Sequence, residues 1–93
     1  MNLDFKNFGQ VLGGRKLAEE IRLKIENSLE PVVLDFSGIR TVSHSFADEL
    51  IGKLAENLGP VAFKQKIKII NLSESNRRVF TFVISERSSK SVA

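Results

Sequence analysis

The side chains in this sequence that could take part in a reaction belong to three adjacent polar residues. Ser43, His44 and Ser45 place two hydroxyls beside the only histidine in the sequence. A serine activated by a histidine is the usual pair for nucleophilic hydrolysis, so a hydrolase built on His44 and a serine is one hypothesis. Neighbouring side chains in a turn rarely meet in that geometry, and Asp35, the nearest acid before the turn, lies inside an expected strand. We therefore expect no catalytic residues and no enzyme activity, with His44 as a surface or partner-contacting residue.

Two acidic residues follow this turn. Ser45 and Asp48 have the spacing of a capping box, in which the serine accepts a hydrogen bond from the amide three residues later and the acidic side chain reaches back. Asp48 and Glu49 would also lie at the positive end of a helix dipole, where they disfavour a bound phosphate or nucleotide. The pattern therefore indicates the start of a helix rather than a reactive serine.

The residues around the turn predict a strand before it and a helix after it. Residues 32–36 are mostly apolar and partly β-branched, and they are bounded by Pro31 and by Ser37-Gly38. After the turn, apolar residues recur at helical spacing, and these are Phe46, Ala47, Leu50, Ile51, Leu54, Ala55 and Leu58. The turn thus lies at the carboxyl end of a strand, where open α/β folds bind their ligands.

The rest of the chain predicts a single α/β domain. We expect a first strand at residues 3–6, a helix at 15–28, a third strand at 64–71 and a last segment at 79–84 that fits either a helix or a strand. A strand–helix–strand connection is parallel and right-handed in nearly all proteins. The predicted fold is a small sandwich of order βαβαβα, with a mostly parallel sheet and helices packed on it. This domain would span residues 1–87, followed by a flexible C-terminal tail at 88–93.

Asn71 and Ser73 follow the expected third strand. They would come to the same edge of the sheet as the turn at residues 43–45, because parallel strands end on the same side. Ser73 has the character of a helix cap. We expect this polar rim to be the place where a partner binds.

Composition excludes several classes of protein. The chain has 93 residues and a net charge of +3, with seven Phe and no Cys, Tyr or Trp. The absence of cysteine rules out disulfides and thiolate metal sites, and so small a domain has little room for a deep substrate cavity. No apolar run approaches the roughly 20 residues that cross a bilayer, and the first residues lack the order of a signal peptide. We expect a cytoplasmic protein with no membrane segment, no metal and no cofactor.

A set of basic residues supports an alternative function. Lys64, Lys66 and Lys68 alternate along the expected third strand, and Arg77-Arg78 follow it. Together they could form the surface of a small basic nucleic-acid-binding protein, whose affinity would fall steeply with salt. Lysines at this spacing are also a common device against edge-to-edge aggregation of strands. We favour the second explanation and keep nucleic-acid binding as the alternative.

Several stretches of the sequence also resemble a known family. The resemblance is carried by LDFSGI, VSHSFADELIGKL and KIKIINLS, and ahead of these by FGQVLGGRKLAEEIRLKI. These stretches are similar to the STAS-like domains of bacterial proteins, which are relatives of the anti-sigma-factor antagonists. The likeness covers most of the chain and leaves out only residues 87–93. It favours a helix at 79–84.

The resemblance implies a regulatory module that acts by protein–protein binding, without catalysis. Its partner would be a histidine-kinase-like ATPase or an anti-sigma-type regulator, and a homodimer is a further alternative. In the antagonists the turn carries an aspartate followed by a phosphorylated serine, and here Ser43 and His44 occupy those two positions. Regulation by phosphate would then require a shifted acceptor, Ser43 or Ser45. The residues expected to bind the partner are Ser43, His44, Ser45, Asp48, Glu49, Asn71 and Ser73.

Overall fold

The computed structural model describes the backbone of residues 1–91 and the side chains of residues 1–88. The elements follow the chain as strands β1 (Asn2–Asp4), β2 (Val11–Leu12), β3 (Val32–Asp35), β4 (Thr41–Val42) and β5 (Ile67–Ile70). The helices are η1 (Phe5–Phe8), α1 (Arg15–Asn27), α2 (His44–Ala47), η2 (Asp48–Gly52), α3 (Lys53–Leu58), α4 (Pro60–Lys66) and α5 (Glu74–Ser91). The predicted order βαβαβα is present, with β2, β4, η1 and α4 as additions.

Two parallel sheets organise the chain. The larger has the order β1-β3-β5, and Leu3, Leu34 and Ile69 are aligned across it. The smaller consists of β2 and β4, with Leu12 opposite Val42. Because all pairs are parallel, the loops after β3 and β5 emerge at one end of the larger sheet, as the sequence predicted.

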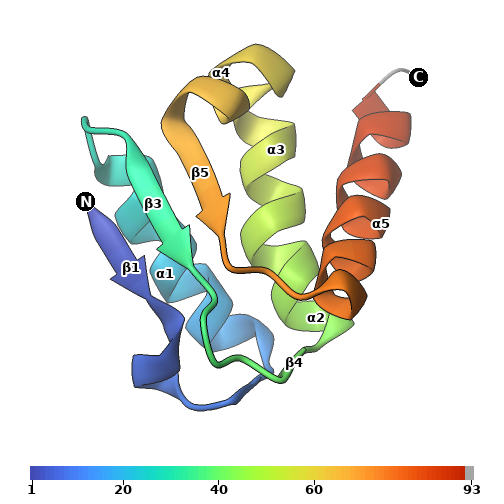
Figure 1. Cartoon of the computed structure of the whole chain (residues 1–93). Coiled ribbons are helices and arrows are strands. Elements are labelled where there is room, and N and C mark those ends of the chain that lie inside the picture. Colours follow the sequence, from blue (N-terminus) through green and yellow to red (C-terminus); the bar gives the residue numbers. More distant parts are fainter. Residues whose placement is uncertain (92–93) are drawn as a thin grey trace.

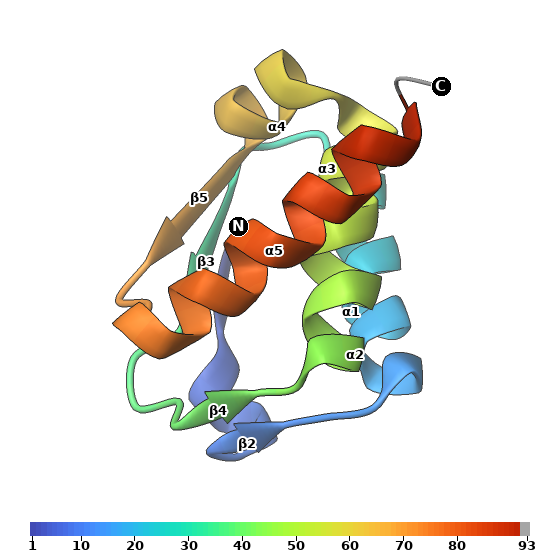
Figure 2. The ribbon, with the colours of Figure 1, turned by 90° about the vertical axis from the view of Figure 1, so that its right-hand side faces the viewer.

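The helices lie on one side of the larger sheet. Figure 1 shows α1 and α3 behind the strands and α5 on the β5 side, and the side view of Figure 2 shows the strands to the left of α1 and α3 with α5 crossing in front. The burial of β3 alternates accordingly, since Val32 and Leu34 are fully buried whereas Val33 and Asp35 are only partly covered. The predicted mixed α/β fold, with helices packed on a parallel sheet, is confirmed.

Four phenylalanines from distant parts of the chain form the centre of the core at the carboxyl end of the sheet. The Phe5 ring stacks on Phe36 with centroids 4.2 Å apart, and Phe36 meets Phe80 edge-on at 5.2 Å. Phe46 lies edge-on to Phe5 at 6.4 Å. This aromatic cluster fixes the ends of β1 and β3 relative to α2 and α5, and so it supports the loops where a site was predicted.

The third strand is shorter than predicted. Lys64 and Lys66 belong to helix α4, and only Lys68 lies on a strand. The prediction failed because alternating lysines imitate strand periodicity, whereas Gly59, at φ +83°, ends α3 and Pro60 occupies the first turn of a new helix. The first strand likewise ends at Asp4, where η1 begins.

The last helix is longer than predicted. Residues 79–84 are helical, which confirms the interpretation favoured by the family resemblance. The tail expected from Ser88 onward is instead a continuation of α5 as far as Ser91. The chain has no glycine or proline after Glu74 to stop the helix there. Residues 92–93 of the expected tail lie outside the described part of the structure.

Candidate functional site

Ser43 caps the helix that follows the turn. Its Oγ accepts a hydrogen bond from the Phe46 amide at 3.1 Å, and its backbone is extended. The predicted cap, Ser45, is instead an exposed residue within the first turn of α2. The capping prediction was wrong by two residues, because β4 ends at Val42 and the helix begins directly after the next residue.

Asp48 pairs with two arginines and does not reach back to the turn. Both of its oxygens accept from Arg87, at 2.9 Å from Nε and 2.7 Å from Nη2, and Oδ2 also accepts from Arg15 at 3.0 Å. The hydrogen bonds from Arg87 are the main reason why the pKa of Asp48 lies far below its ordinary value. This residue therefore joins η2 to α5 and α1.

Glu49 is buried at the same junction, with 3% of its surface exposed. It accepts from Lys53 Nζ at 3.0 Å, from Arg22 Nη2 at 3.2 Å and from Arg15 Nη1 at 3.3 Å. Burial alone would raise its pKa, but the hydrogen bonds from Lys53 and Arg22 outweigh that effect and the pKa of Glu49 is lowered. The partner-binding role predicted for Asp48 and Glu49 conflicts with this geometry, because both carboxylates are held by cations of their own chain.

His44 is exposed at the start of α2 and lies against an aromatic residue of α5. Its ring centroid is 5.4 Å from that of Phe82, with the two planes at 57°. Within the described residues no hydrogen bond joins His44 to Ser43 or Ser45, and the Ser43 hydroxyl is engaged with an amide. The arrangement brings together an imidazole, a phenyl ring and the free hydroxyl of Ser45, rather than a nucleophile and its base.

Asn71 and Ser73 have structural roles at the other part of the rim. Asn71 adopts φ +59°, and its Nδ2 donates to Asp35 Oδ1 at 3.0 Å. This hydrogen bond is the largest cause of the lowered pKa of Asp35, followed by the one from the Ser37 amide. Ser73 Oγ accepts from the Asn76 amide at 3.3 Å, which confirms its predicted role as a helix cap.

Asn76 connects the two halves of the rim and was missed by the sequence analysis. Its Oδ1 accepts from the Val42 amide at 3.1 Å, and its Nδ2 lies 3.4 Å from the Arg40 carbonyl. The side chain is buried, and it satisfies backbone groups of β4 and of the residue before it that have no strand partner on that side. An asparagine next to a helix start has no distinctive sequence signal, because the same residue is common in turns.

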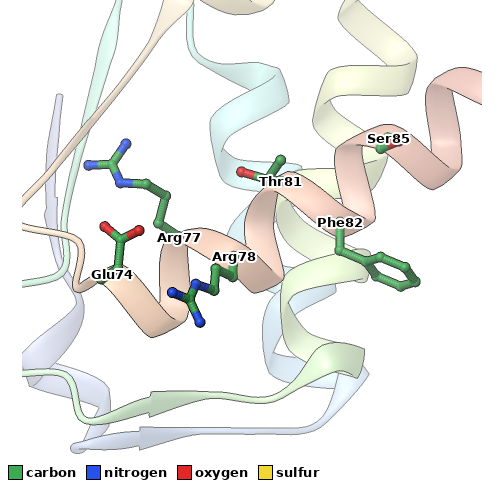
Figure 3. Close-up of a pocket in the computed structure, with 6 residues that line it drawn as sticks. All are labelled: Glu74, Arg77, Arg78, Thr81, Phe82 and Ser85. Carbon is green, nitrogen blue, oxygen red and sulfur yellow. The ribbon is translucent and has the colours of Figure 1, made fainter.

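The outer face of α5 carries a shallow hollow beside His44. Its volume is about 440 Å³, and Figure 3 shows the six residues that line it, which are Glu74, Arg77, Arg78, Thr81, Phe82 and Ser85. The Phe82 ring projects away from the helix, and Arg78 lies one turn before it. With 53% of its surface exposed, Phe82 is the most accessible phenylalanine among the described residues.

The basic residues considered for nucleic-acid binding are distributed over the molecule. Lys64 and Lys66 lie in α4, whereas Arg77 and Arg78 lie in the first turns of α5, at the opposite end of β5 (Figure 1). Lys68 lies between them, on the sheet face that no helix covers. The single strip of positive charge that the expected strand would have provided is therefore absent from the described residues.

No helix within residues 1–91 combines the length and the apolar character needed to cross a membrane.

Comparison with known proteins identifies the family. A family model described as a STAS-like domain of unknown function (DUF4325) matches residues 14–77, which is more than half of the chain. This range runs from the start of α1 to the first turn of α5, so it includes the turn at 43–45, both carboxylates of η2 and Asn76. No curated protein and no solved structure matches the chain. The match agrees with the resemblance and with the observed fold, and the chain belongs to this family of STAS-like domains.

Proposed function

We propose that this STAS-like domain is a non-enzymatic regulatory module that binds a protein partner. The binding surface is formed by the first turn of α2 and the outer face of α5, through His44, Ser45, Arg78 and Phe82, and we call it the α2–α5 surface. The observation that carries the proposal is the exposed Phe82 ring packed against the exposed His44 ring. Aromatic and arginine side chains contribute most of the binding energy in protein interfaces.

The internal ion pairs support the same proposal. Asp48 and Glu49 are held by Arg87, Arg15 and Arg22, so they keep α5 in place against η2 and α1. Two elements that are distant in sequence thereby present one continuous surface. The partner would be of the histidine-kinase-like ATPase or anti-sigma type, as the family resemblance suggests. Binding of this kind needs neither a metal nor a cofactor.

Regulation by phosphate would use Ser45. Of the two serines considered, Ser43 is engaged as the helix cap, whereas the hydroxyl of Ser45 is exposed beside His44. A phosphate on Ser45 would add close to two negative charges to the α2–α5 surface, beside His44. Because the acidic side chains that follow are already paired with cations, they would not prevent the modification.

The test is capture of partners from an extract of the source cells by the immobilised domain. The wild-type domain should retain a specific protein, and Phe82→Ser should lose it. Leu23→Ser is the matched control, because Leu23 is a similarly exposed apolar residue on α1, 46% accessible. Identical capture by all three proteins would contradict the proposal.

A second pair of variants tests the regulation. Ser45→Asp should weaken capture while the fold stays intact, because the new charge lies on the surface itself. Ser45→Ala should bind like the wild type. If Ser45→Asp captures the partner as well as the wild type does, the domain is a constitutive binder and the phosphate-dependent part of the proposal fails.

A further inference from the structure

Strands β1 and β5 are the edges of the larger sheet, and β5 is the edge nearer to α5. Strand β5 pairs with β3 on one side, and no strand lies on its other side within residues 1–91. The Phe36 amide donates to the Ile70 carbonyl at 3.1 Å, so the backbone groups of Ile70 point towards β3. Backbone groups alternate in direction along a strand, and those of Ile69 therefore point to the open edge. Unpaired groups of this kind are a template for another strand.

An apolar groove runs beside this edge. Helix α5 packs on α3 and η2 rather than along β5, which leaves two adjoining hollows with volumes of about 160 and 230 Å³. They share Ile84 of α5. The apolar residues of the first hollow are Ile69, Leu72, Phe80 and Ile84, and those of the second are Ala55, Pro60, Phe63 and Ile84. Side chains of an added strand that point towards the helices would enter this groove.

Among the side chains of residues 1–88, the charges around the groove are all of one sign. In that part of the chain, Arg77 is the charged residue that lines the first hollow, and Lys64 is the one that lines the second. Lys68 lies on β5 itself, exposed on the sheet face opposite to the groove. Side chains of an added strand that point to that open face would lie next to Lys68, where an acidic residue forms a favourable cross-strand pair.

We propose that the open edge of β5 binds an extended segment of a partner protein in which apolar and acidic residues alternate. The segment adds a fourth strand to the sheet, with its apolar residues in the groove and its acidic residues beside Lys68. Main-chain hydrogen bonds supply affinity and the alternate pockets supply specificity in this mode of recognition. The site is separate from the α2–α5 surface, and the inference goes beyond the function proposed above.

A second copy of the chain fits this edge less well. Pairing of β5 with the β5 of another molecule would place the two Lys68 side chains on the same face of the joined sheet. Because β5 has only four residues, the two charges would lie close together. Like charges opposite each other destabilise a strand pair. Lys68 on its own would also discourage indiscriminate pairing while still admitting an acidic partner.

The test uses a short synthetic peptide in which valine and glutamate alternate, titrated into isotope-labelled domain and followed by amide chemical shifts. We expect the largest shifts at Ile69, Leu72 and Ile84. A peptide with N-methyl groups on alternate amides should not bind, because it cannot donate main-chain hydrogen bonds to β5. Substitution of lysine for glutamate in the peptide should also abolish binding.

Two protein variants test the charge argument. Lys68→Glu replaces a favourable cross-strand pair by a repulsive one. It should weaken the binding of the valine–glutamate peptide about threefold to tenfold. Lys24→Glu makes the same charge change at an exposed position of α1 and should have no effect. Phe82→Ser should also leave peptide binding unchanged, so failure at this site is distinguishable from failure of the α2–α5 surface.

Several results would overturn the proposal. These are shifts confined to other parts of the domain, equal binding of the N-methylated peptide, or equal weakening by Lys68→Glu and Lys24→Glu. Sedimentation of the free domain as a dimer with a protected Ile69 amide would also overturn it, because the edge would then be occupied by a second copy.

Discussion

Replacing Asp48 by asparagine removes the charge that holds α5 against η2 and α1 while keeping the size of the side chain. Asp48 accepts two hydrogen bonds from Arg87, and the side chains are 13% and 19% exposed, so the pair is largely buried. Loss of one partner of a fully buried ion pair costs about 3–5 kcal/mol, whereas an exposed pair contributes about 0–1 kcal/mol. Arg87 keeps Glu56 at 3.2 Å and some access to water, and we therefore expect a loss of about 2 kcal/mol.

That loss would leave the variant folded under native conditions. A chain of this length has a free energy of unfolding of about 5–14 kcal/mol. A loss of about 2 kcal/mol would lower the Tm by about 8–16 °C. Urea denaturation followed by circular dichroism gives the free energy directly. Glu86→Gln is the matched control, because it removes one negative charge from an exposed position of α5, the helix that Asp48 holds in place.

The pH dependence provides a second measurement. The pKa of Asp48 in the folded domain is lowered, chiefly by Arg87, below the value of about 3.9 for an unfolded chain. The stabilisation is therefore complete above about pH 5 and is lost as the pH falls through the folded pKa. The difference between wild type and Asp48→Asn should be constant from about pH 5 to 8 and should shrink below about pH 4.

Two results would refute this reasoning. One is a loss smaller than about 0.5 kcal/mol at neutral pH, which is the range of ordinary surface substitutions. The other is a difference between the two proteins that persists unchanged at low pH, because a contribution from the ionised carboxylate must disappear there.

Three further predictions concern the same end of the molecule. Ser43→Ala should lower the free energy of unfolding, measured by urea denaturation, by about 1 kcal/mol through loss of the helix cap. Ser45→Ala should change it by less than about 0.5 kcal/mol, and equal effects would contradict the assignment of the cap. Gly52→Ala should cost about 1–3 kcal/mol, because the new Cβ would lie 2.9 Å from Asp48 Oδ1, and a neutral effect on Tm would show that the carboxylate moves freely. Asn76→Ala should cost about 1–3 kcal/mol by leaving buried backbone groups unsatisfied, and an unchanged urea midpoint would count against its role as a link between β4 and α5.

The elements that could be predicted are those with a long, regular pattern. The change from a β-branched run at 32–36 to helical spacing after the turn located β3 and the following helix, and the apolar stripe at 15–28 located α1. Strands β2 and β4 have two residues each, which is too short for any periodicity to show. Alternating lysines before Ile67 looked like a strand, although Pro60 was a valid signal for a helix start.

The candidate site was predicted only in part, because several of its contacts join residues that are far apart in the sequence. The location of the turn and the role of Ser73 followed from local sequence. The partners of Asp48 did not, because Arg87 is 39 residues away and no local pattern links the two. Glu49 was expected at the surface, where acidic residues usually lie, and its burial depends on three cations supplied by α1 and α3. Phe82 was not singled out in the sequence, and only the packing of α5 shows its ring on the outside.

The aromatic cluster has a consequence for the motions of the domain. Phe5 comes from the first residues of the chain and Phe80 from its last helix, and both contact Phe36. Neither end of the chain can detach without exposing rings that the other end covers, so unfolding should be cooperative rather than stepwise. The Phe46 and Ala47 amides at the start of α2 donate to Ser43 next to the same cluster, and they should exchange their hydrogens no faster than global unfolding allows, which would make this turn a rigid platform.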